Sequence, residues 1–266
     1  MDLVCLISDL HVGRQTPTYN IEVFRQRFAR ILNFLRSHAH HHIHLFFLGD
    51  MVDGENIYPR QPYDQDVDIN TALNEVLTAC IKACEYAARC WCVVGNHGRS
   101  SRRGKGNWDW VLYRMLKEAV EPMGVEVNVS DGWYQVAEVK GWRFLLTHGD
   151  NVRMYQQIPY YGIHRAVTRW KSGGIQEDFD VVCMGHFHTV ADFWVNDVRV
   201  LLNGTMLSGD DYSERMGLKP VNAFWVFAVG KKSPIVWSRL VWVDGQMEKC
   251  TFKWTNRQCK CHLHST

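Results

Sequence analysis

Five short segments of this 266-residue chain carry aspartate, histidine or asparagine directly after an apolar run. They are Ser8-Asp9-Leu10-His11, Leu48-Gly49-Asp50, Val94-Gly95-Asn96-His97, Thr147-His148-Gly149-Asp150 and Gly185-His186-Phe187-His188. Carboxylate, amide and imidazole groups are ligands of divalent metals, and two such ions held close together promote the hydrolysis of phosphoesters. One segment alone would be weak evidence, but five in succession predict a two-metal hydrolytic site.

The apolar runs before these segments have the composition of buried strands. They are Leu3-Ile7, Ile43-Phe47, Cys92-Val94, Phe144-Leu146 and Val181-Met184. In an α/β sheet the strand ends line up along one edge, and ligands bind there. We therefore expect residues that lie far apart in the sequence to converge on one crevice. Glycines 49, 95, 149 and 185 are expected to let the backbone turn tightly at the strand ends.

The rest of the chain supplies the elements that must position this crevice. Apolar residues at helical spacing predict helices over 21–35, with Asn20 or Thr18 as the cap, and over 69 to about 89, 109–120 and 160–170. After residue 125 strands dominate, and we expect them at 134–139, 143–146, 192–195, 199–202, 224–229, 236–243 and 248–254, the last two joined by a turn at Asp244-Gly245. No repeat or composition break divides the chain. We expect one domain over residues 1–266, with a flexible tail from about residue 256.

Composition excludes several classes of protein. The chain is 46% apolar and 22% charged, which is typical of a globular domain that needs no staples. No apolar stretch approaches the roughly 18 residues that span a bilayer, and the N-terminus lacks the basic flank of a signal peptide. The nine cysteines form no disulfide framework, so free thiols and a cytoplasmic location are expected. The oligomeric state stays open, a homodimer included.

In this order, the five segments resemble the pattern of the calcineurin-like metallophosphoesterase superfamily: D-x-H, G-D, G-N-H, a later His-Gly and G-H-x-H. The resemblance runs from Asp9 to His188 and implies a four-layer α/β/β/α sandwich of two mixed sheets flanked by helices. Two departures concern the substrate. The family often has an acidic residue after G-N-H, where this chain has Gly98, and the loop after G-D is extended from Glu55 to Asp68.

The resemblance also implies a role for each ligand residue. One metal ion would be held by Asp9, His11, Asp50 and His188, and the second by Asp50, Asn96, His148 and His186. Asp50 would bridge the two ions. Mixed nitrogen and oxygen ligation suits Mn, Fe or Zn better than Ca, and we expect Mn. His97 would be the general acid that protonates the leaving alkoxide after attack by a metal-activated hydroxide.

Local composition beside the metal segments indicates the substrate. Arg99, Arg102, Arg103 and Lys105 follow His97 directly, and residues 153–171 interleave four cations with tyrosine and tryptophan. Cations follow a phosphate backbone and aromatic rings stack on bases, so we predict a nuclease, similar to the SbcD-like branch of the family. Solvated loops with inward-facing aromatics are the alternative reading of both stretches. A phosphomonoesterase for phosphoproteins or nucleotides, and a non-catalytic nucleic-acid-binding accessory subunit, stay open as other functions, as does the choice between DNA and RNA.

Two further clusters contain possible metal ligands. The histidine-rich run 38–44 lies between a helix and a strand, at the sheet edge opposite the proposed site, and is interpreted as a solvated turn. Near the C-terminus, Cys250, Cys259, Cys261, His262 and His264 have the spacing C-x-C-H-x-H over their last four members. This is not the spacing of a standard zinc finger, so a tail is favoured over a structural zinc.

Overall fold

The computed structural model describes residues 1–55, 57–58, 61–103, 105–155, 158–209 and 219–245. Its α-helices are α1 Ile21–Ser37, α2 Ile69–Cys84, α3 Trp108–Val120 and α4 Tyr160–Arg169. Short 3-10 turns span Gln61–Tyr63 and Glu121–Met123, and a π-turn spans Trp170–Gly174. Among the described residues, no helix combines the length and apolarity that crossing a membrane requires.

The strands form two sheets, and each sheet mixes parallel and antiparallel pairs. The first has the order β11-β10-β1-β2-β3-β4, and the second has the order β5-β6-β7-β9-β8. The first sheet contains β1 Asp2–Ile7, β2 His42–Phe47, β3 Ala87–Cys92, β4 Glu126–Val129, β10 Ala223–Val229 and β11 Trp237–Trp242. The second contains β5 Tyr134–Val139, β6 Trp142–Thr147, β7 Val181–Met184, β8 Ala191–Val195 and β9 Val198–Leu202. Strands β1 to β4 are parallel neighbours, as are β6, β7 and β9.

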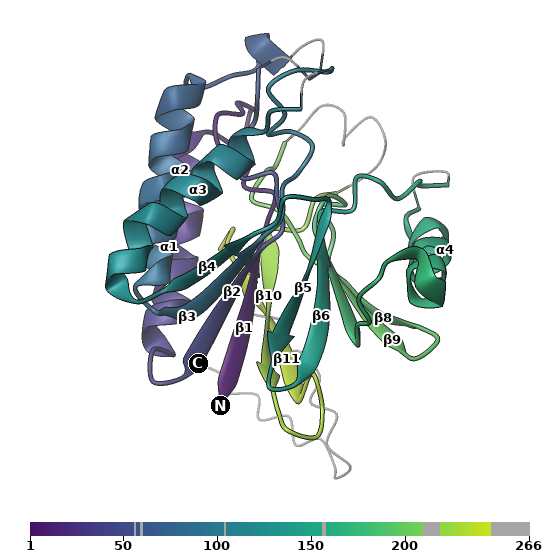
Figure 1. Cartoon of the computed structure of the whole chain (residues 1–266). Coiled ribbons are helices and arrows are strands. Elements are labelled where there is room, and N and C mark those ends of the chain that lie inside the picture. The colour runs from purple at the N-terminus through teal and green to yellow at the C-terminus, as the bar shows by residue number, and fades with distance from the viewer. Residues whose placement is uncertain (56, 59–60, 104, 156–157, 210–218, 246–266) are drawn as a thin grey trace, which may run out of the picture.

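The two sheets face each other, with helices outside them on both sides. Figure 1 shows α1, α2 and α3 over the outer face of the first sheet and α4 over the outer face of the second. Alternation along β1 matches this arrangement, since Leu3, Cys5 and Ile7 pack toward the helices. Val4 and Leu6 point the other way, into the layer between the sheets. The predicted four-layer sandwich is confirmed.

The second predicted helix is too long at its C-terminal end. Its helical spacing continues to about Arg89, but α2 ends at Cys84 and the chain enters β3 at Ala87. Residues 87–92 pair in parallel with β2, and this pairing outweighs the helical preference of alanine and arginine. Strand β3 therefore ends at Cys92, where the sequence had suggested that a strand begins.

The other boundaries agree with the sequence to within two residues where the structure describes them. Asn20 caps α1, because its side chain accepts a hydrogen bond from the Val23 N–H at 3.0 Å. Strand β4 is short and was not predicted. The run of histidines is only partly a turn, since His42 and His44 belong to β2 and His44 is buried. The predicted strand 248–254 and the C-terminal Cys/His cluster lie outside the described residues.

Replacing Phe144 tests how much the apolar layer between the two sheets contributes to stability. Its ring is fully buried and lies 5.7 Å from the ring of Phe46 and 5.6 Å from that of Phe227. Phe144→Ala should lower the free energy of unfolding by about 3–5 kcal/mol, because the cavity would be flanked by two sheets that cannot collapse. Urea unfolding followed by fluorescence measures the loss. Met115→Ala, on the exposed side of α3, should change stability by less than about 0.5 kcal/mol. Similar losses in the two variants would contradict this account of the core.

Candidate metal centre

The five sequence segments meet at one edge of the sandwich. Each follows the C-terminal end of a strand that has a parallel neighbour: β1, β2 and β3 in the first sheet, and β6 and β7 in the second. The residues that come together there are Asp9, His11, Asp50, Asn96, His97, His148, His186 and His188. Both sheets therefore contribute to the site, as the alignment of parallel strand ends predicts.

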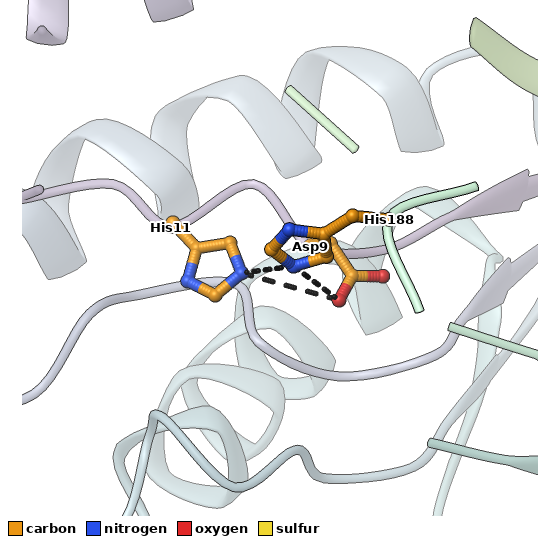
Figure 2. Close-up of side chains that lie close together, drawn as sticks. All are labelled: Asp9, His11 and His188. Carbon is orange, nitrogen blue, oxygen red and sulfur yellow. Dashed lines mark hydrogen bonds and ion pairs between the residues drawn. The ribbon is translucent and has the colours of Figure 1, made fainter. Parts of the chain in front are cut away.

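The first cluster consists of Asp9, His11 and His188 (Figure 2). The Nε2 atoms of the two histidines are 3.0 Å apart. The Asp9 Oδ1 atom lies 3.4 Å from Nε2 of His188 and 3.9 Å from Nε2 of His11. Atoms bound to one ion at the usual bond lengths of about 2.1 Å are separated by about 3 Å or slightly more, so these three donor atoms fit a common ion.

The second cluster consists of Asp50, His148 and His186, with Asn96 beside it. Nε2 of His148 lies 2.9 Å from Oδ2 of Asp50 and 3.0 Å from Oδ1 of Asn96. The Asn96 amide nitrogen donates to the hydroxyl of Tyr58 at 2.7 Å, which directs the amide oxygen toward His148. Tyr58 belongs to the extended loop after the G-D segment, so this insertion helps to orient a predicted ligand.

The hydrogen bonding of His148 shows that its cluster suits a cation. Its Nδ1–H donates to the Leu48 carbonyl at 2.7 Å, so in the neutral ring Nε2 carries a lone pair. That lone pair faces the oxygens of Asp50 and Asn96, and three acceptors cannot satisfy one another without a positive charge between them. Without such an ion, the ring takes a second proton. Burial lowers the pKa of His148, but the negative charge of Asp50 outweighs burial and raises that pKa to about 10.

Asp50 is the residue that reaches both clusters. Besides facing His148, its Oδ2 lies 3.9 Å from Nε2 of His11 in the first cluster. Its Oδ1 accepts a hydrogen bond from the backbone N–H of His97 at 2.7 Å. Burial raises the pKa of this carboxyl, but the facing His148 and His97 outweigh burial and hold the pKa well below its usual range. The position of Asp50 is the one that a bridging carboxylate would need.

The backbone at these residues is strained. Among the described residues, seven non-glycine residues have positive φ angles, and five of them belong to the two clusters: Asp9, His11, Asp50, His186 and His188, with φ between 49° and 70°. Left-handed backbone at a residue with a side chain costs on the order of 1 kcal/mol. Such strain persists only where the surrounding structure imposes it, which is typical of functional sites.

Glycines at the strand ends serve two different purposes. Gly49 and Gly149 have φ angles of +88° and +107°, so the expected tight turns occur at these two positions. Gly95 and Gly185 do not have positive φ. A Cβ atom at Gly95 would strike the carboxylate of Asp50, and one at Gly185 would lie 2.6 Å from Oδ2 of Asp9. These two glycines are required because a cluster carboxylate occupies the space of a side chain.

His97 has a carboxylate partner that the sequence analysis missed. Its Nδ1 lies 2.5 Å from Oδ1 of Asp53, a buried residue that also accepts a hydrogen bond from Gln61 Nε2 at 2.9 Å. Burial lowers the pKa of His97, but the charges of Asp50 and Asp53 outweigh burial and raise it. The signal in the sequence was a second aspartate three residues after Asp50, within the same strand-end loop.

The basic segment beside His97 divides into two pairs. Arg99 forms an ion pair with Asp150 at 2.6 Å, and Arg102 donates to the Ile57 carbonyl at 2.7 Å. Arg103 and Lys105 are exposed, and within the described part of the chain neither has an ion-pair partner. Arg99 and Arg102 therefore tie loops together, whereas Arg103 and Lys105 remain available to a ligand.

A family model gives the same family as the sequence motifs. The family model described as calcineurin-like phosphoesterase matches residues 3–190. Similar solved structures include an archaeal phosphodiesterase (15% identity, 90% of this chain and 98% of the other, TM-score 0.47). Another is zinc-bound Vps29 from Entamoeba histolytica (15% identity, 86% of this chain and 87% of the other, TM-score 0.44). A third is the phosphoesterase Yfce from E. coli (14% identity, 90% of this chain and 99% of the other, TM-score 0.42). No curated protein matches the chain.

Removing the negative charge of Asp50 should weaken metal binding at both clusters. We expect the protein to bind two divalent ions per chain. Asp50→Asn should lower the occupancy of both ions, because the single Asp50 carboxylate faces both clusters. Metal content after dialysis against Mn²⁺, measured by mass spectrometry, reports the stoichiometry. The control is Asp197→Asn, an exposed aspartate in the turn between β8 and β9, which should keep two ions. A fully loaded wild-type protein with one ion or none would contradict the prediction.

Proposed function

This chain belongs to the calcineurin-like phosphoesterases, and from that premise we propose that it hydrolyses phosphodiester bonds in nucleic acid with the help of two divalent ions. The observation that carries the proposal is the pair of adjoining clusters, each with carboxylate and imidazole donors, that Asp50 connects. We propose manganese as the ion, since the donors are mixed nitrogen and oxygen atoms; iron and zinc fit the same donors.

Seven side chains would hold the ions. Asp9, His11 and His188 serve the first ion, Asn96, His148 and His186 serve the second, and Asp50 serves both. When bound, the ions neutralise the charge of the phosphodiester and make water a nucleophile at neutral pH. The chain itself supplies a rigid set of donors, because Asp9 accepts from the His186 N–H and His148 is fixed by the Leu48 carbonyl. Fixed donors of this kind avoid reorganisation during the reaction.

His97 would donate the proton that the leaving oxygen needs. Asp53 occupies Nδ1 of the imidazole, which leaves Nε2 to carry the mobile proton. The ring lies edge-on to that of His11, with centroids 4.5 Å apart, so the acid would stand directly beside the first cluster. The ring of Tyr58 also packs against that of His97, with centroids 4.8 Å apart.

Two exposed groups, each following one of the cluster segments in the sequence, support a polymeric, anionic substrate. The first is the pair Arg103 and Lys105 in the loop that follows His97. The second follows His148 in the sequence, where Tyr155 is 66% exposed and Tyr161 is 64% exposed. Exposed arginines at 153 and 165 lie in the same segment. Cations and aromatic rings in alternation favour the backbone and bases of a single strand over a small phosphomonoester.

Some residues of the segment 153–171 contact other parts of the protein and are not free to bind a substrate. Trp170 packs against Trp133 with ring centroids 5.3 Å apart, and Lys171 pairs with Asp178 at 2.5 Å. These residues hold the end of α4 to the second sheet rather than facing a ligand. The inward-facing alternative therefore fits Trp170, and Tyr160 packs against Phe193 with ring centroids 5.2 Å apart, whereas Tyr155 and Tyr161 are mostly exposed.

A direct assay separates the candidate activities. Labelled single-stranded and double-stranded DNA and RNA are incubated with the protein and Mn²⁺, beside bis-p-nitrophenyl phosphate and p-nitrophenyl phosphate. Cleavage of nucleic acid and of the small diester, with little turnover of the monoester, is expected. Preference for the monoester would favour a phosphatase, and metal binding without turnover of any substrate would favour an accessory subunit.

Loss of His97 should slow the reaction without releasing the ions. His97→Ala should lower kcat on nucleic acid by about 10²–10⁴-fold, the usual contribution of a general acid. The loss should be much smaller on bis-p-nitrophenyl phosphate, whose nitrophenolate leaves without a proton. Asp53→Asn should show the same dependence on the leaving group, with a smaller loss. Equal losses on both substrates, at unchanged metal content, would show that His97 is not the acid.

Neutralising Arg103 and Lys105 should weaken the binding of nucleic acid but not the hydrolysis of a small diester. Arg103→Ala combined with Lys105→Ala should lower nucleic-acid affinity and reduce the slope of log K against log salt by about 1–2, because fewer counterions are released. Turnover of bis-p-nitrophenyl phosphate should not change. The matched control is Lys231→Ala with Lys232→Ala, an exposed pair in the β10–β11 connection, at the opposite end of the first sheet. If both double variants bind nucleic acid as the wild type does, the loop is merely solvated.

A further inference from the structure

A buried carboxylate outside both clusters joins the loops that carry their ligands. Asp109 is fully buried in the first turn of α3. Its Oδ2 accepts from the backbone N–H of Asp50 at 2.8 Å and of Gly95 at 2.9 Å. Its Oδ1 accepts from the N–H of Met51 at 3.1 Å and, more weakly, of Val52 at 3.4 Å. One side chain thus ties the loop after β2 to the loop after β3.

These hydrogen bonds differ from those of an ordinary acidic residue at a helix start. An acidic residue there usually accepts from N–H groups of its own helix, whereas the donors to Asp109 belong to two other segments. The helix start is secured separately by Asn107. The Asn107 side chain accepts from the Asp109 N–H at 2.8 Å and donates to the Gly95 carbonyl at 2.8 Å. The Asp109 carboxylate is therefore free to serve the loops.

Gly98 leaves the space that this carboxylate fills. A Cβ atom at position 98 would lie 2.9 Å from Cγ of Asp109 and 2.6 Å from Oδ1 of Asn107. The backbone at Gly98 does not have positive φ, so room rather than conformation excludes a side chain there. Position 98 is also the one at which the family pattern often has an acidic residue directly after G-N-H.

We infer that Asp109 is a positioning residue for the metal centre, and that it supplies from α3 the carboxylate that is absent at position 98. The inference rests on the proposed function, because the ligands in question are those of the proposed ions. Asp50 faces both clusters, and Asn96 directly follows Gly95. Because the N–H groups of Asp50 and Gly95 are bonded to the same oxygen of Asp109, the distance between the ligands Asp50 and Asn96 is fixed.

The consequence is a metal centre whose geometry depends on a residue that touches no ion. Groups that orient metal ligands usually contribute 10- to 100-fold to metal affinity. Asp109→Asn should therefore weaken Mn²⁺ binding by about 10- to 100-fold, because the amide nitrogen that replaces one oxygen cannot accept from the loop N–H groups. Isothermal titration with Mn²⁺ measures this change independently of turnover.

The matched control removes stability from the same helix without touching the loops. Leu112 is fully buried on α3, and Leu112→Ala should destabilise the fold while leaving Mn²⁺ affinity within about 3-fold of the wild type. Gly98→Ala provides the second variant, since its methyl group would crowd the side chains of Asn107 and Asp109, which together join α3 to the two loops. It should weaken Mn²⁺ binding in the same direction as Asp109→Asn, although residue 98 is not one of the proposed ligands.

Hydrogen exchange of the metal-free protein gives a readout that needs no ion. In Asp109→Asn, the amides of Asp50, Met51 and Gly95 should exchange faster, and in Leu112→Ala their protection relative to the rest of the chain should be retained. Wild-type affinity for Mn²⁺ with wild-type protection in Asp109→Asn would overturn the inference, as would a loss of affinity in Leu112→Ala that equals the loss in Asp109→Asn. A wild-type protein that binds no Mn²⁺ would instead overturn the proposed function, and the exchange measurement would still decide the role of Asp109.

Discussion

The burial of several carboxylates in one place is the constraint on which the rest of the structure depends. Asp9, Asp50 and Asp53 have almost no exposed surface, and unpaired buried charges of this kind would cost several kcal/mol each. Facing imidazoles and backbone N–H groups offset part of that cost, and a bound cation would offset more. The facing histidines and the glycines that make room for the carboxylates surround these charges.

The sandwich meets this constraint through its parallel strands. Strand ends from two sheets deliver the two clusters to one edge, and the strand ladders hold the loops in register. That rigidity is what sustains left-handed backbone at five cluster residues, a conformation that a free loop would relax. Asp109 extends the same principle, because it converts the start of α3 into a clamp on two of these loops.

Arginines that look equivalent in the sequence have different roles in the structure. Arg99 closes the loop after β3 onto the loop after β6 through Asp150, whereas Arg103, four residues later, faces outward. A polymer bound at this edge would therefore meet only part of the positive charge that the sequence displays. The proposed specificity for nucleic acid depends on that exposed part, together with the exposed rings of Tyr155, before α4, and Tyr161, within it.

The sequence by itself determined which residues follow the strand ends, since strand-end motifs and apolar periodicity are local properties that a short window encodes. The family and the sandwich followed from the resemblance of those five segments to the family pattern. Only the tertiary structure decided what each residue faces. Asp53 as the partner of His97, Tyr58 beside Asn96 and Asp109 across from Gly98 all depend on contacts between separate loops. The end of α2 at Cys84 was likewise set by the pairing of β3 with β2. These features could not be read from local pattern, because the register of parallel strands, rather than spacing along the chain, brings the partners together.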